Sequence, residues 1–242
     1  MRKIRLSTNN FYHIYNRGVD GRTIFPEDSY YRRFTLILEH SLKYNYPYSQ
    51  LIFRLRTAGS TQIKREILAQ LETKRMNPPV EIISFCLMPN HYHLALKQLV
   101  ENGISDFLHR IGTSYTRYFN TRLSRSGRLF ETSFKAVGVE SDNQLLHLTR
   151  YQHLNPIVLG LHTAANLKSY PWSSFPNYMG KEGFSFVNPN PVVSLLGSAQ
   201  VYTDFVTAKM NTPEPQYIEK VAIDNDLGWF VQKPSNQASL KS

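Results

Sequence analysis

The sequence predicts an α+β protein in which a mainly antiparallel sheet packs against helices. Short runs rich in β-branched and aromatic residues have the length of strands, and Pro89-Asn90 links two of them as a tight hairpin. Segments with helical spacing of apolar residues lie between other strands. Hairpin links mixed with helices are typical of an α+β fold. We expect strands over residues 11–17, 51–56, 80–87, 91–97 and 128–139.

Helices are predicted where apolar residues recur every three or four positions. Asp28 and Asp142 are suitable N-caps, and Pro156 is expected to end the helix that starts at Asp142. We expect helices over residues 28–44, 60–76, 103–123, 142–154 and 192–210.

The domain organisation is predicted from changes in composition along the chain. We expect one domain over residues 1–180, with the helix 60–76 inserted into it. A helical extension is expected over 181–230. The last residues, 231–242, are polar and are predicted to form a disordered tail.

Charge and cysteine content restrict the function classes. The 242 residues carry a formal net charge of +10, which favours a polyanionic partner such as nucleic acid. Cys86 is the single cysteine, so an internal disulfide and a cysteine zinc site are excluded. No apolar run reaches the 18 residues of a membrane span, and no signal peptide is recognisable at the N-terminus. We therefore expect a basic cytoplasmic protein that does not span a membrane.

The stretch "MPNHYHLAL" (88–96) contains two histidines on a predicted strand. Side chains alternate along a strand, so His91 and His93 share a face, roughly 6 to 7 Å apart at Cα. They can bind one metal ion, or they can be buried histidines that bond backbone carbonyls. A metal site needs at least a third ligand, so the spacing leaves both interpretations open.

A second constellation lies on the helix that contains "LLHLTRYQHLNP" (145–156). Tyr151 and Asn155 are one helical turn apart, which places a phenol beside an amide oxygen. Such an oxygen can coordinate Mg²⁺ or Mn²⁺, and a phenolate can attack a phosphodiester. Tyr151 can equally be a core residue, and Asn155 a residue at the end of the helix before Pro156.

Basic residues cluster between the two constellations and predict phosphate contacts. Arg110 and Arg117 share one face of a predicted helix, and a flexible basic loop follows it. A solvated helix face is the alternative for any one of them. The candidate nucleic-acid-binding residues are Arg110, Arg117, Arg122, Arg125, Arg128 and Lys135.

Taken in order, these motifs resemble the single-tyrosine HUH transposases, and among them most closely the REP-associated tyrosine transposases. "MPNHYHLAL" is followed by "RYQHLNPIVLGL". Other matching pieces are "YHIYNRGVDGRTIF", "ISDFLHRIGTSYTRYFN", "GRLFETSFKAVGVES" and "YPWSSF". The resemblance covers about residues 11–206.

The resemblance implies a ferredoxin-like or RRM-like antiparallel sheet with helices on one face, the histidines on a central strand and the tyrosine on a nearby helix. It implies an enzyme that uses Mg²⁺ or Mn²⁺ to cut single-stranded DNA beside hairpins such as REP elements. Tyr151 would form a 5′-phosphotyrosine link and free a 3′-hydroxyl. His91 and His93 would bind the metal, with Asn155 as the third ligand, where related insertion-sequence enzymes carry glutamine.

Three matters stay open at this point. The REP-associated branch implies a monomer, while other relatives form dimers that share a tyrosine helix. A non-catalytic, domesticated protein that binds hairpin DNA or RNA is the alternative function. A zinc hydrolase would need a water-activating carboxylate, and the nearest in sequence, Glu81 and Glu101, lack metalloenzyme spacing.

Overall fold

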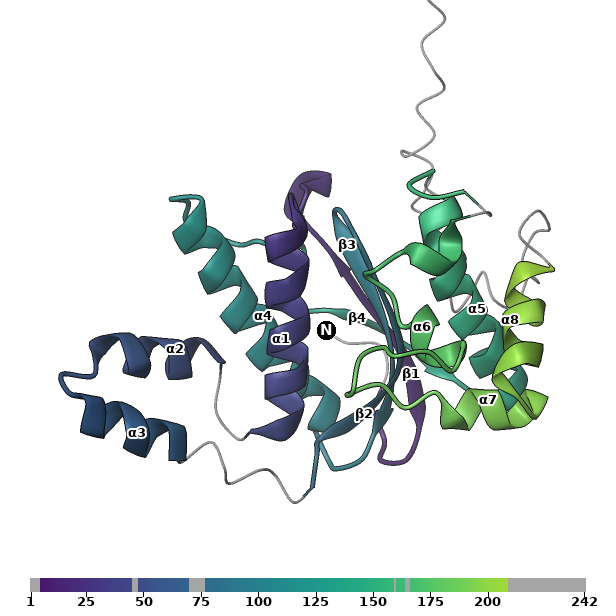
Figure 1. Cartoon of the computed structure of the whole chain (residues 1–242), viewed down its shortest axis with the longest axis horizontal. Helices are drawn as coiled ribbons and strands as arrows, with labels where there is room; N and C mark the ends of the chain where they lie inside the picture. The colour runs from purple at the N-terminus through teal and green to yellow at the C-terminus, as the bar shows by residue number, and fades with distance from the viewer. Residues whose placement is uncertain (1–4, 45–47, 70–76, 159, 164–165, 209–242) are drawn as a thin grey trace, which may run out of the picture.

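A four-stranded antiparallel sheet forms the centre of this computed structural model (Figure 1). The structure describes residues 5–44, 48–69, 77–158, 160–163 and 166–208. The strand order is β2-β3-β1-β4, and every neighbouring pair is antiparallel. The strands are β1 (Phe11–Arg17), β2 (Val80–Met88), β3 (His91–Gln98) and β4 (Lys135–Val139). The predicted antiparallel sheet is confirmed, and β3, which carries both histidines, is a central strand.

Helices cover both faces of the sheet (Figure 1). On one face lie α1 (Asp28–Lys43) and α4 (Gly103–Arg122), which connect β1 to β2 and β3 to β4. With this strand order they give the ferredoxin-like β-α-β-β-α-β arrangement that the family resemblance implied. Against the other face pack α5 (Asp142–Val158) and α7 (Asn190–Leu196), and α8 (Ala199–Thr207) packs on these two helices. The expectation of helices on one face therefore accounts for only one of the two helical layers.

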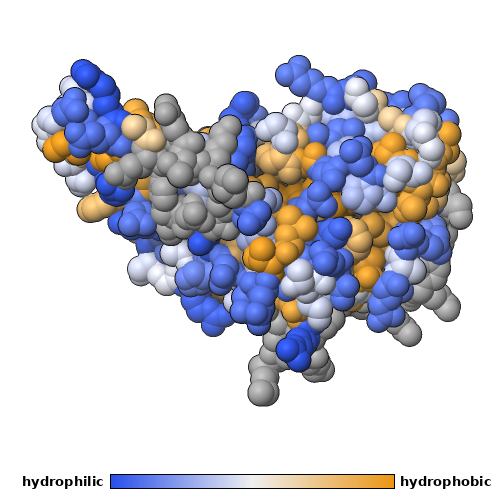
Figure 2. Space-filling model, turned by 90° about the horizontal axis from the view of Figure 1, so that it is seen from below, coloured by the Kyte–Doolittle hydropathy of each residue, from blue (hydrophilic) through white to orange (hydrophobic). Residues whose placement is uncertain are grey.

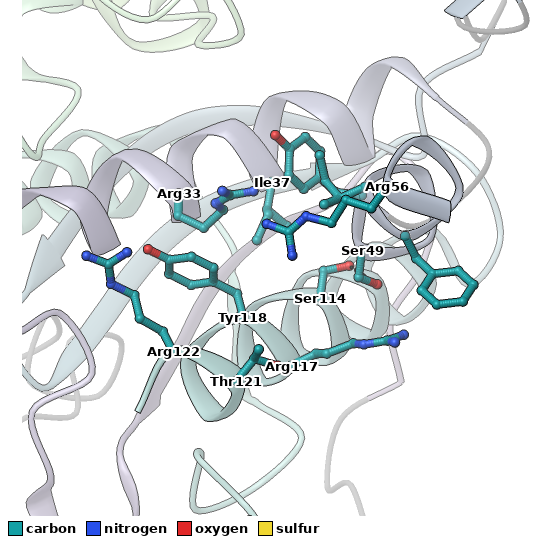
Figure 3. A pocket seen from close by; sticks show the side chains of 12 residues that line it. Arg33, Ile37, Ser49, Arg56, Ser114, Arg117, Tyr118, Thr121 and Arg122 are labelled. Carbon is teal, nitrogen blue, oxygen red and sulfur yellow. Dashed lines mark hydrogen bonds between the residues drawn. The ribbon is translucent and has the colours of Figure 1, made fainter. Parts of the chain in front are cut away.

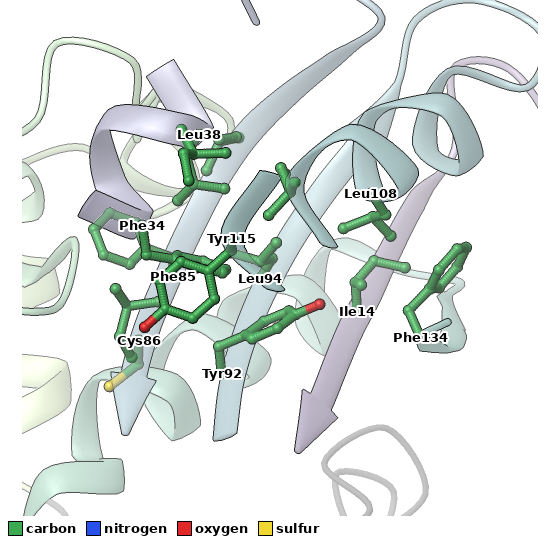
Figure 4. Close-up of a cluster of buried hydrophobic side chains, with 14 of the residues drawn as sticks. Ile14, Phe34, Leu38, Phe85, Cys86, Tyr92, Leu94, Leu108, Tyr115 and Phe134 are labelled. Carbon is green, nitrogen blue, oxygen red and sulfur yellow. The ribbon is translucent and has the colours of Figure 1, made fainter. Parts of the chain in front are cut away.

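The alternation of side chains along β3 gives each face of the sheet its own core. Tyr92, Leu94 and Leu96 are buried in the core shared with α1 and α4 (Figure 4). His93 and Ala95 point to the opposite face, where Ala95 joins the core formed with α5. Burial of each large apolar side chain contributes about 1.5–3 kcal/mol, so both helical layers are held firmly against the sheet.

Residues 51–56 are helical, so the strand predicted there is wrong. They belong to α2 (Tyr48–Thr57), which is followed by α3 (Thr61–Ala69), and the two helices lie at one end of the molecule (Figure 1). Tyr48, Leu51, Ile52 and Leu55 recur at helical spacing, and these positions are the less exposed ones. Residues 70–76 of the predicted 60–76 helix lie outside the described residues.

Two further expectations are corrected at element boundaries. The strand predicted over 128–139 is β4 alone, because Phe130 and Phe134 enter the core from the irregular segment before it. The helix predicted over 192–210 is α7 and α8, separated by Gly197 at φ 82° and begun again at Ser198, whose hydroxyl accepts from Val201 N–H. Residue 209 onward, including the predicted tail 231–242, lies outside the described residues.

Residues 170–188, here called the edge segment, run along the outer edge of β2. The Leu87 N–H donates to the Trp172 carbonyl at 2.9 Å, and the Ser174 N–H donates to the Phe85 carbonyl at 3.0 Å. The edge segment includes α6 (Phe175–Tyr178) and follows the short helix η3 (Leu167–Ser169); another short helix, η1 (Val19–Gly21), follows β1. Backbone groups of Ile82, Phe85 and Leu87 on this edge of the sheet are therefore paired.

The surface seen in Figure 2 is mostly hydrophilic, with apolar side chains exposed between the polar ones. No helix in the described part of the chain is long and apolar enough to cross a membrane.

Candidate active site

His91 and His93 lie side by side on the face of the sheet that packs against α5. Their ring centroids are 4.9 Å apart and their planes are almost perpendicular, at 88°. His91 is 8% exposed and His93 is 1% exposed. The pairing predicted from strand alternation is therefore the geometry observed.

Both imidazoles are neutral at physiological pH because of their burial. Burial, with the positive charge of Arg17, lowers the pKa of His91 to about 4. Burial lowers the pKa of His93 well below its usual value, and His91 and His13 lower it further. A neutral imidazole keeps a lone pair on one ring nitrogen, which is the form that binds a metal ion.

Hydrogen bonds orient the two rings. His91 Nδ1 lies 2.7 Å from Asn90 Oδ1, so Nδ1 carries the proton and Nε2 keeps the lone pair. His93 Nδ1 lies 3.0 Å from Nε2 of His13, a buried residue of β1. If His93 Nδ1 is the donor, His93 Nε2 also keeps a lone pair, and His13 holds the ring in place.

His13 is a residue of this site that the sequence analysis did not predict. Alternation along β1 places His13 and Tyr15 on one face of the sheet, and β1 is the neighbour of β3. The signal was therefore present in the strand pattern, but the strand order was needed to use it. Tyr15 also stacks near His93, with ring centroids 6.2 Å apart.

Tyr151 of α5 contacts the histidine pair within the same chain. Its ring meets the ring of His93 edge to face, with centroids 5.8 Å apart and an interplanar angle of 86°. Tyr151 is 9% exposed, and Asn155, one turn further along α5, is 1% exposed. Tyr151 is also part of the core on this face, so its position agrees both with a packing role and with a role in the site.

Helix α5 continues to Val158, so the expectation that it ends before Pro156 is wrong. Asn155 is consequently inside the helix and not at its end. A helical backbone at Asn155 keeps its side chain on the same side of α5 as Tyr151. The alternative of Asn155 as a helix-end residue is thereby excluded.

Several buried polar atoms at this place have no hydrogen-bond partner. They include His93 Nε2, Tyr151 Oη and Asn155 Nδ2. Leaving a buried polar atom unsatisfied costs about 1–3 kcal/mol, so native proteins rarely keep several together without a ligand. The atoms that would meet a metal ion or a phosphate are the atoms that the protein leaves unsatisfied.

The donor set fits a divalent ion held by two imidazoles and an amide. A rotation of the Asn155 amide exchanges its nitrogen and oxygen, so it can present an oxygen. Among the described residues, no group of three or more His, Cys, Asp or Glu side chains is arranged to hold a metal ion. A metal site formed by His91 and His93 would therefore take its third protein ligand from a neutral side chain, for which Asn155 is the candidate.

The six basic residues predicted to bind nucleic acid do not form one patch. Lys135 of β4 lies over the Tyr15 ring at 5.5 Å, close to the histidines. The other five are on α4 or in the loop after it, and α4 covers the opposite face of the sheet. Arg110 donates to the Tyr44 carbonyl at 3.2 Å, and Arg122 pairs with Glu27 at 3.1 Å.

Arg125 and Arg128 order the loop between α4 and β4. Arg125 Nη2 donates to the Arg128 carbonyl at 3.0 Å, and Arg128 donates to the Glu131 carbonyl. Glu131 in turn pairs with Arg17 at 2.5 Å, next to His91 in the β1–β3 register. This loop therefore reaches the end of the sheet where the histidine pair begins.

Comparison with known proteins gives a family match. Residues 45–153 match the family model described as "Transposase IS200 like". The matched range contains His91, His93 and Tyr151 but not Asn155. No curated protein matches the chain. A solved structure of a REP-associated tyrosine transposase bound to a REP hairpin is 15% identical, covering 78% of this chain and 92% of that one at a TM-score of 0.46.

The match agrees with the resemblance that the ordered motifs indicated. Over residues 45–153, the chain is similar to the IS200-like transposases.

Proposed function

We propose that this protein is a metal-dependent endonuclease and strand transferase that cuts single-stranded DNA beside hairpins through a covalent 5′-phosphotyrosine at Tyr151. The observation that carries the proposal is the contact between Tyr151 and His93 within one chain. The family match supports transposition as the process in which the reaction takes place.

His91, His93 and Asn155 would hold a Mg²⁺ or Mn²⁺ ion. When bound, such an ion polarises the scissile phosphate and stabilises negative charge on its oxygens. His13 and Asn90 act as positioning residues, because their hydrogen bonds fix the two imidazole rings.

Tyr151 is the proposed nucleophile. Its phenol oxygen forms a bond to the 5′-phosphorus while the bond from phosphorus to the 3′-oxygen breaks. The phenol proton ends on the departing 3′-oxygen, which leaves as a hydroxyl. The burial of Tyr151 keeps water away from the phosphotyrosine ester, so the bond energy is preserved for rejoining.

One chain supplies every residue of the proposed site, so we propose a monomer as the active form. Lys135 and the Arg125–Arg128 loop are near the histidine end of the sheet and would contact DNA phosphates there.

The test is an adduct assay with hairpin-bearing single-stranded DNA and Mg²⁺ or Mn²⁺. We expect a protein–DNA complex that resists denaturation and is absent with chelator. Tyr151→Phe should eliminate it, and His91→Ala should remove the metal-dependent cleavage. Tyr12→Phe is the matched control, because Tyr12 is also buried but faces the α1 and α4 core.

An adduct formed by Tyr151→Phe would show that another tyrosine is the nucleophile. Tight hairpin binding that is indifferent to chelator and leaves no adduct would instead support the non-catalytic binding protein.

A further inference from the structure

A cavity of about 360 Å³ opens between α1, α2 and α4 (Figure 3). This volume is in the range of pockets that bind small organic groups. The hydroxyls of Ser49 and Ser114 lie 3.4 Å apart in its lining, and Ser114 is 2% exposed. We call this cavity the arginine pocket, for the residues described next.

Four arginines line the arginine pocket and no acidic residue does: they are Arg33, Arg56, Arg117 and Arg122. Figure 3 shows the side chains of Arg33 and Arg56 extending toward each other. Arg122 pairs with Glu27, whereas the other three form no ion pair with any carboxylate of the described residues. Like charges gathered without a counter-charge repel one another, and a bound anion relieves that repulsion.

Aromatic rings accompany the arginines. The Arg33 guanidinium lies over the rings of Tyr118 at 4.6 Å and Tyr48 at 5.2 Å, which holds it in place. The Arg117 guanidinium lies 5.7 Å from the ring of Phe53. Phe53 is 54% exposed, which leaves much of its ring open for stacking. Guanidinium groups beside open aromatic rings are the pattern that binds single-stranded nucleic acids.

The arginine pocket is separate from the site of Tyr151. It is formed by the α1 and α4 layer together with α2, whereas Tyr151 and the histidines are on the other face of the sheet. Its ligand therefore has to reach a different side of the molecule.

We propose that the arginine pocket binds a nucleotide unit of single-stranded nucleic acid, with its phosphate on Arg56 and Arg117 and its base stacked on Phe53. A nucleotide has a phosphate that binds the arginines and a base that stacks on the aromatic rings of the lining, whereas inorganic phosphate would bind only the arginines. The proposal concerns binding alone and holds whether or not Tyr151 cuts DNA.

The test uses the full chain carrying Tyr151→Phe, in chelator, so that cleavage does not enter the measurement. Arg56→Glu/Arg117→Glu is compared with Lys64→Glu/Arg65→Glu, which changes net charge equally at exposed positions of α3 outside the pocket. Fluorescence anisotropy with a labelled, hairpin-free oligonucleotide gives the affinity over a range of salt concentrations.

We expect the pocket variant to bind at least about tenfold more weakly at 0.1 M salt. Its salt dependence should fall by about 0.7 in log–log slope, the amount for one lost phosphate contact on a single strand. The control should stay within about twofold. Equal affinities in the two variants would overturn the proposal, because the effect would then be one of net charge.

A second measurement locates the bound strand. An oligonucleotide with photoreactive iodinated uracil should crosslink to a peptide containing Phe53, and Phe53→Leu should weaken binding several-fold while leaving the fold intact. Crosslinks confined to α5 and β3 would overturn the proposal. Competition by a mononucleotide as strong as by the oligonucleotide would overturn the assignment to a strand and identify a free nucleotide as the ligand.

Discussion

At the scale of single residues, the hydrogen bond between His13 and His93 decides which nitrogen of His93 is available. A proton on His93 Nδ1, donated to His13 Nε2, leaves the lone pair on His93 Nε2, which is the atom proposed to bind the metal ion. Sequence spacing placed His91 and His93 on one face but could not include His13, because a contact between strands depends on their order and register. Side-chain alternation is local, whereas the β1–β3 pairing joins residues 80 positions apart.

His13→Ala should weaken Mn²⁺ binding by about 10- to 100-fold, the usual effect of removing a residue that orients a metal ligand. Titration calorimetry of the variant measures the loss. His109→Gln, at an exposed position of α4, is the control and should bind as the parent does. Equal affinities for His13→Ala and the parent would remove His13 from the site.

His153 makes stability depend on pH. It is buried between Tyr202 and Ser174, which lie 2.9 and 2.8 Å from its ring nitrogens, and burial lowers its pKa to about 3. Between pH 6.5 and 3 the unfolded chain therefore binds a proton at His153 that the folded chain does not. The contribution of this residue is complete above pH 6.5 and falls by about 1.4 kcal/mol per pH unit as the pH drops through that window.

His153→Gln should reduce the slope of the unfolding free energy against pH between pH 6 and 4. The reduction should be about 1.4 kcal/mol per pH unit, which corresponds to one proton. Denaturant unfolding at a series of pH values measures that slope. His91 and His93 also have lowered pKa values and remain in the variant, so a smaller slope should persist. An unchanged slope would mean that His153 titrates alike in both states.

At the scale of elements, periodicity predicted those strands and helices whose patterns were long or had clear ends. The alternation in β3 and the spacing in α4 are of this kind. The apolar residues within 51–55 fit both the period of a strand and the period of a helix. Contact with α4 is what determines that this segment is helical. The meeting of Tyr151 with His93 could not be derived from spacing, since it joins a helix to a strand. The family resemblance predicted it.

Two glycines of α4 should respond oppositely to alanine. A Cβ at Gly103 would lie 2.2 Å from the Pro79 carbonyl oxygen, while one at Gly112 would meet nothing within 4 Å. Gly103→Ala should destabilise the protein by about 1–3 kcal/mol through this clash. Gly112→Ala should stabilise it by about 0.5–1 kcal/mol through helix propensity. Thermal or denaturant unfolding of the pair tests both, and equal effects would contradict the close approach at Gly103.

At the scale of the whole molecule, the sheet separates two surfaces. Its α5 face carries the histidines and Tyr151, and its α1 and α4 face carries the arginine pocket. The net charge of +10 indicated a polyanionic partner but could not indicate that the basic residues divide between faces. That division follows from the strand order, which places α4 and α5 on opposite sides.

A metal ion bound to unsatisfied buried atoms should stabilise the whole fold. Mn²⁺ at 100 times its dissociation constant should raise the unfolding free energy by about 2.7 kcal/mol, visible as a higher melting temperature. His93→Ala should abolish most of this increase, while His109→Gln should keep it. A melting temperature that does not respond to Mn²⁺ in the parent protein would contradict the metal site.

The edge segment has a consequence for synthesis. The outer edge of β2 pairs with residues that follow the strand by about 85 to 100 positions. At roughly 5–20 residues per second, the ribosome needs on the order of 5–20 s to deliver them. During that interval a nascent chain presents an unpaired row of amide and carbonyl groups, which is a template for wrong pairing. The edge of β2 is covered only after the edge segment, residues 170–188, has been synthesised.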